Sequence, residues 1–178
     1  MSLGADGGDT RYAWRIECEA AEKTPMLGWF RKKTTDPAAD FHSIMVTLLV
    51  GGEQSLFILL GADGSINRVG TGTAANAKRD MFIGRTDPAL FSGLLAQVTP
   101  ELLAWCGQLR SDAEPHGQVC ELTVGFKRAS GEELLTVWQY GSESQGPPPE
   151  VRQFVVAAVQ ATDPWFARQQ AMVRGVNE

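Results

Sequence analysis

The stretch that decides the fold is SLFILLGADGSINRV, residues 55–69. Six largely apolar residues are followed by the turn Gly61-Ala62-Asp63-Gly64 and by a short return strand. Glycine accepts a positive φ without steric cost, so this composition predicts a tight turn between two antiparallel strands. Residues 41–50 form a third apolar strand ahead of them. Because 41–50 and 55–60 are apolar on both sides, we expect a meander of central strands covered on both faces.

A similar order of elements returns after residue 117. Two alternating strands meet at a turn at Gly131, and an apolar helical stripe follows from Phe154 to Val159. Pro100 and Pro164 each follow a capping residue, which predicts that each begins a second helix. These matches favour an internal duplication of a strand-turn-strand-helix-helix unit, with pseudo-repeats at 41–110 and 117–175. Chance is the alternative, because this order of elements is common.

These patterns predict an α+β fold with a mainly antiparallel sheet of about six strands. The helices are expected on one face, because each carries a single apolar stripe to bury. We expect a disordered N-terminal segment at 1–10 and one domain over 11–178. Within that domain, apolar and polar residues alternate over 11–20, which predicts a strand with one solvent-exposed face. Residues 21–40 have no sustained period and are expected to form a long connection.

Composition excludes several classes of function. A net charge of −5 argues against non-specific binding to nucleic acid and against adhesion to an anionic membrane. No apolar run reaches the roughly 20 residues of a membrane span, and the first ten residues lack the pattern of a signal peptide. Three cysteines without a CxxC motif predict reduced thiols, a cytoplasmic location and no zinc site. No cofactor is expected.

The irregular stretch 70–85 is the first candidate for a ligand site. Arg79 and Arg85 could bind a carboxylate or phosphate through bidentate contacts, with Asp80 beside them. The alternative is that each arginine pairs with a neighbouring aspartate. Gly70-Thr71-Gly72-Thr73 lacks the spacing of a phosphate-binding loop, because no lysine follows a glycine there.

A second candidate is the aromatic and basic run Trp29, Phe30 and Arg31, since tryptophan and arginine often anchor interfaces. The alternative is an edge strand or flap with a solvated basic rim. Neither His42 nor His116 has a serine, cysteine or carboxylate near it in a catalytic arrangement.

Two hypotheses about function follow. The first is a soluble, non-enzymatic binding or adaptor protein that acts through a protein partner or through self-association. It predicts a flat apolar patch that includes Trp29, Phe30 or the last helix. The alternative is a small-molecule enzyme or ligand-binding domain with an anion pocket under the 70–85 loop, in which Asp80 or His42 acts as a base.

Overall fold

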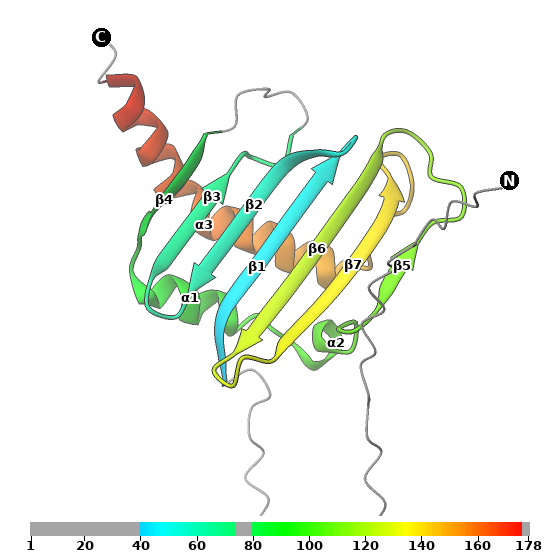
Figure 1. Cartoon of the computed structure of the whole chain (residues 1–178), viewed down its shortest axis with the longest axis horizontal. Coiled ribbons are helices and arrows are strands. Elements are labelled where there is room, and N and C mark those ends of the chain that lie inside the picture. The colour runs from blue at the N-terminus through cyan, green and yellow to red at the C-terminus, as the bar shows by residue number, and fades with distance from the viewer. Residues whose placement is uncertain (1–39, 74–79, 176–178) are drawn as a thin grey trace, which may run out of the picture. The chain divides into compact units, whose positions relative to one another are not determined.

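Seven strands and three helices make up the part of the chain that the computed structural model describes, residues 40–73 and 80–175 (Figure 1). In chain order these elements are β1 (Phe41–Val50), β2 (Glu53–Gly61), β3 (Ser65–Val69), β4 (Met81–Arg85), α1 (Pro88–Leu95), α2 (Pro100–Leu103), β5 (Leu109–Ser111), β6 (Val119–Arg128), β7 (Glu133–Gly141) and α3 (Pro149–Gly175). The segments expected at 1–10 and 11–20 lie outside the described residues.

All seven strands join one sheet in the order β4-β3-β2-β1-β6-β7-β5. Every neighbouring pair is antiparallel except β5 and β7, which are parallel. The prediction of a mainly antiparallel sheet combined with helices is therefore confirmed. Five of the seven strands were predicted from the sequence. β4 and β5 were not, and the sixth predicted strand, at 11–20, lies outside the described residues.

The three helices lie behind the sheet as it is viewed in Figure 1. Alternate side chains of the central strands are buried on this side, where they meet the apolar stripe of α3. The fully buried apolar strand residues of this core are Ile44, Val46, Leu56, Ile58, Leu60, Ile66, Val124 and Phe126. From α3, the core receives Val151, Phe154, Ala158, Trp165 and Phe166. The helix layer thus closes one side of the sheet.

Local signals set the turn and the two short helices. Gly64 has a φ of +81°, and a Cβ there would collide with the carbonyl oxygen of Thr86, so the turn needs glycine. Asp87 caps α1 by accepting a hydrogen bond from the Ala89 amide at 2.8 Å. Thr99 caps α2 in the same way, through the Leu102 amide at 3.2 Å. These starts agree with the sequence.

The helix start predicted at Pro164 is wrong. Pro164 lies inside α3, which runs as one helix over Pro149–Gly175. A repeated unit is likewise not shown. The range 41–110 contributes four strands and two short helices before β5, whereas 117–175 contributes two strands and one long helix.

A buried arginine joins β3 to α3 close to that proline. The Arg68 side chain is fully buried, and its guanidinium lies 2.7 Å from the carboxylate of Asp163. It also donates hydrogen bonds to the Thr162 hydroxyl, to the Val159 carbonyl oxygen at 3.4 Å and to the Gly70 carbonyl oxygen at 3.2 Å. Burial lowers the pKa of Arg68, and the charge of Asp163 acts in the opposite direction. The cation is stabilised because each of the three guanidinium nitrogens donates to at least one acceptor.

We predict that Asp163→Ala lowers the free energy of unfolding by roughly 3 kcal/mol, because it leaves a buried guanidinium without its carboxylate. Adding Arg68→Met to that variant should recover most of the loss, since methionine fills much of the space without a charge. Urea denaturation of the wild type, the single variant and the double variant measures both effects.

The matched control is the exposed pair in which Lys127 lies 2.8 Å from Glu133. Glu133→Ala should cost less than about 1 kcal/mol, as exposed ion pairs do. An Asp163→Ala loss no larger than that of Glu133→Ala would show that the buried pair does not hold α3 on the sheet.

Candidate functional site

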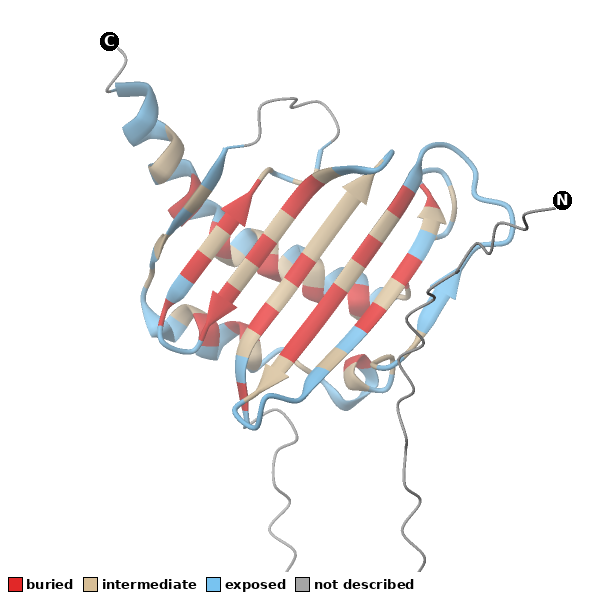
Figure 2. Ribbon diagram, viewed as in Figure 1, coloured by how far each residue is buried: buried red, intermediate tan, exposed pale blue. Residues whose placement is uncertain are grey.

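The described helices cover one face of the sheet only. Along the central strands, buried residues mostly alternate with less buried ones, with Val69 and Gly125 as buried exceptions (Figure 2). Because successive side chains of a strand point to opposite faces, the less buried set lies on the face away from the helices. We call that second side of the sheet the open face. The sequence predicts central strands covered on both faces, but in the part of the chain described here no helix lies over the second side.

Strand pairing arranges the open face in two rows of neighbours that cross the sheet. The first row consists of Ile83, Asn67, Leu59, Met45, Gly125 and Leu135. The second consists of Met81, Val69, Phe57, Thr47, Thr123, Val137 and Leu109. Apart from one asparagine, one glycine and two threonines, both rows are apolar. Ile83 is 71% exposed, and Met81, Leu109 and Leu135 are exposed as well.

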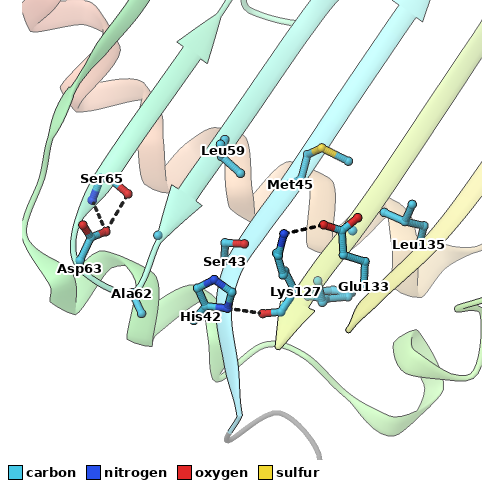
Figure 3. A pocket seen from close by; sticks show the side chains of 13 residues that line it. His42, Ser43, Met45, Leu59, Ala62, Asp63, Ser65, Lys127, Glu133 and Leu135 are labelled. Atoms are coloured by element: carbon cyan, nitrogen blue, oxygen red, sulfur yellow. Dashed lines mark hydrogen bonds and ion pairs between the residues drawn. The ribbon is translucent and has the colours of Figure 1, made fainter. Parts of the chain in front are cut away.

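A groove of about 640 Å³ is hollowed into the open face at the ends of β1, β2, β6 and β7 (Figure 3). Its apolar lining includes Met45, Leu59 and Leu135, three neighbours in the first row. Gly125 lies between Met45 and Leu135 in that row and has no side chain to fill the space. A Cβ on Gly125 would lie 2.6 Å from Cδ2 of Leu135 and 3.3 Å from Cε of Met45. The glycine therefore sets the depth of the groove.

Polar groups line the rim of this groove and are bonded to one another. Nδ1 of His42 lies 3.0 Å from the carbonyl oxygen of Lys127, so this nitrogen is the donor. The Lys127 ammonium lies 2.8 Å from the Glu133 carboxylate. Asp63 accepts hydrogen bonds from the Ser65 hydroxyl at 2.6 Å and from its amide at 3.0 Å. The hydroxyl contact is the main cause that lowers the pKa of Asp63. These contacts fix the rim but do not pair a nucleophile with a base.

The anion site predicted under the 70–85 loop from Arg79, Arg85 and Asp80 stays a prediction. Arg79 lies outside the described residues. Asp80 is exposed, and Arg85 is 77% exposed with its guanidinium 3.8 Å from the Asp63 carboxylate. Neither Asp80 nor Arg85 lines the groove. Trp29, Phe30 and Arg31 lie outside the described residues too, so the interaction site predicted there stays a prediction.

Sequence reasoning missed the open-face residues as a site. Met45, Leu59 and Leu135 belong to three strands, and only the pairing register places them side by side. The available signal was the two-sided apolarity of 41–50 and 55–60. His42 was considered as a base, and the structure places it on the groove rim.

Neither a metal site nor a membrane-spanning helix is found among the described residues. Residues 40–73 and 80–175 contain no group of three His, Cys, Asp or Glu side chains placed to hold a metal ion. None of the helices described here is long and apolar enough to cross a membrane.

Two cysteines are in the described structure, and both are free thiols. Burial raises the pKa of Cys106 to about 11. Burial also raises the pKa of Cys120, which lies in the core side of β6. Because the thiolate is the reactive form, neither environment activates its cysteine as a nucleophile.

Comparison of the chain with family models, with curated proteins and with solved structures finds no match.

We predict that iodoacetamide labels Cys106 of the folded chain about 200-fold more slowly at pH 8 than it labels an ordinary thiol, because a pKa near 11 leaves few thiolates. The rate should rise about tenfold for each pH unit up to about pH 10, since the thiolate fraction grows in that proportion. Peptide mass spectrometry reads each cysteine separately, and the unfolded chain is the control. A rate that levels off near pH 9 would contradict the raised pKa.

Proposed function

We propose that this chain is a binding protein without an enzymatic step, and that its open face holds a protein partner or a second copy. One observation supports the proposal above the others: two rows of mainly apolar side chains cross the sheet on the side that the described helices leave uncovered. Folded monomers seldom expose contiguous apolar patches larger than a few hundred Å², and larger ones mark interaction sites.

The charges on this face also suit a protein interface. Lys127 is paired with Glu133, and Glu121 accepts a hydrogen bond from Gln139 at 2.9 Å. A partner that covers the Lys127–Glu133 pair leaves neither of these two charges without its counter-charge. An apolar centre with a polar rim is the usual anatomy of such surfaces.

The hydrogen bonds of the rim favour binding over catalysis. A general base must reach the proton that it removes, and a nucleophile must touch its base. His42 is held by a backbone carbonyl, and Asp63 is held by Ser65 in its own turn. These groups contribute to the shape of the groove.

A second candidate is a small amphiphilic ligand in the groove. Its volume of about 640 Å³ lies within the ordinary range of ligand pockets, and its apolar floor lies beside the polar rim. A thermal-shift screen with amphiphiles separates this candidate from a protein partner. Stabilisation that is lost in Gly125→Leu, which fills the hollow, would favour the small ligand.

We predict that a photo-crosslinker placed on the open face captures the partner. Replacement of Leu59 or Leu135 by p-benzoyl-phenylalanine, followed by illumination of living cells, should give a discrete adduct heavier than the 19.3 kDa chain. These positions lie in the middle of the first row, where a bound protein would be in contact. The adducts are read on a denaturing gel and by mass spectrometry.

The matched control is Val156, an exposed apolar residue of α3. A crosslinker there should give no such adduct, because Val156 is on the outer side of the helix layer. Absence of adducts from positions 59 and 135, or the same adduct from position 156, would overturn the proposal. An adduct of twice the mass of the chain would identify the occupant as a second copy.

A further inference from the structure

The two edges of the sheet differ in how they are protected. β5 is three residues long, and its central Arg110 is bonded to Gln108 and lies over the ring of Trp105. Short edge strands with charged side chains resist the addition of another strand. β4 ends the other side of the sheet with five residues. It exposes Met81 and Ile83 on the open face, so it is the edge suited to pair further.

The helix under β4 is longer than the sheet it covers. Trp165 packs beneath Gly84 and donates a hydrogen bond to the Arg85 carbonyl oxygen at 3.0 Å. Phe166 meets the ring of Phe82 edge-on at 5.5 Å. Figure 1 shows α3 passing behind β4 and continuing beyond the edge of the sheet.

The apolar side of α3 continues into this overhang. Residues seven apart lie on the same side of a helix, so Met172 follows Trp165 on the side that faces the sheet. Trp165 is buried under β4, whereas Met172 is 56% exposed. A strand added beside β4 would lie over the overhang and cover Met172.

We propose that the added strand is β4 of a second copy of this chain, paired antiparallel about a twofold axis at Ile83. In that register Ile83 meets its own counterpart, Phe82 lies opposite Gly84, and Met81 lies opposite Arg85. A large ring thus meets a glycine, and no charge meets a like charge. The strand complements itself without a bulge.

A second copy is chosen as the partner because β4 can pair with itself in this register. In a twofold pair every contact occurs twice, so each copy supplies one edge strand and one helix overhang to the other. A single peptide strand could pair with the edge of β4, but it would bring no helix to lie beneath that strand. The pairing would join the two open faces into one continuous surface. It goes beyond the proposed function, because it uses the edge of the sheet and does not depend on what the open face binds.

The test is the solution mass of the full chain, measured by multi-angle light scattering and by sedimentation equilibrium. The wild type should have about twice the 19.3 kDa of one chain at roughly 100 µM. Ile83→Lys and Ile83→Glu should each weaken the dimer by at least about 100-fold, because like charges then meet at the axis. An equimolar mixture of the two variants should restore the dimer, since lysine then faces glutamate.

Ile83 is exposed in the single chain, so these substitutions remove no core packing. Val119→Lys on β6, another exposed apolar position, is the matched control and should leave the mass unchanged. A monomeric wild type, or a dimer that persists in both Ile83 variants, would overturn the inference. Adducts from positions 59 and 135 in a monomeric chain would leave the proposed function standing. A dimer that gives no adducts at positions 59 and 135 would support the β4 pairing and contradict the proposed binding at the open face.

Discussion

The arrangement of the two layers depends on one buried cation. Arg68 projects from β3 into the apolar space between the sheet and α3, where an uncompensated charge would cost several kcal/mol. The chain meets this cost by placing Asp163 and Thr162 of α3 against the guanidinium. These acceptors are consecutive residues of α3, so their contacts tie one turn of the helix to β3. The cation therefore fixes where α3 lies as well as how strongly it is held.

Contacts with the sheet hold α3 on both sides of Pro164, where a local rule failed. Proline lacks the amide donor of a helix turn and usually ends or kinks the helix. In α3, Arg68 donates to the Val159 carbonyl in the turn before the proline, while Trp165 and Phe166 are buried just after it. Packing from a distant strand outweighs the local preference. By contrast, the helix starts at Pro88 and Pro100 use caps within the same few residues, and sequence alone predicts them.

The open face marks a second limit of sequence reasoning. The two-sided apolarity of 41–50 and 55–60 predicts cover on both faces, yet such strands look the same whether helices of the same chain or another molecule cover them. The groove was also hidden, because Met45, Leu59 and Leu135 become neighbours only through the pairing register. Residue chemistry alone pointed to Arg79, Arg85 and Asp80 in an irregular loop, of which Asp80 and Arg85 are exposed. β4 was missed because five residues are too few for a clear period.

The position of α3 also has a consequence at the edge of the sheet. Because Arg68 holds the helix at Asp163, the next turns pass beneath β4, and the remaining turns extend past it. The helix layer therefore extends further than the sheet at this edge. In a single copy this mismatch leaves Met172 and Ile83 in water, where neither contributes to stability. Pairing of two copies through β4 would make the layers equal in extent, so the proposed dimer follows from the position in which the buried cation holds α3.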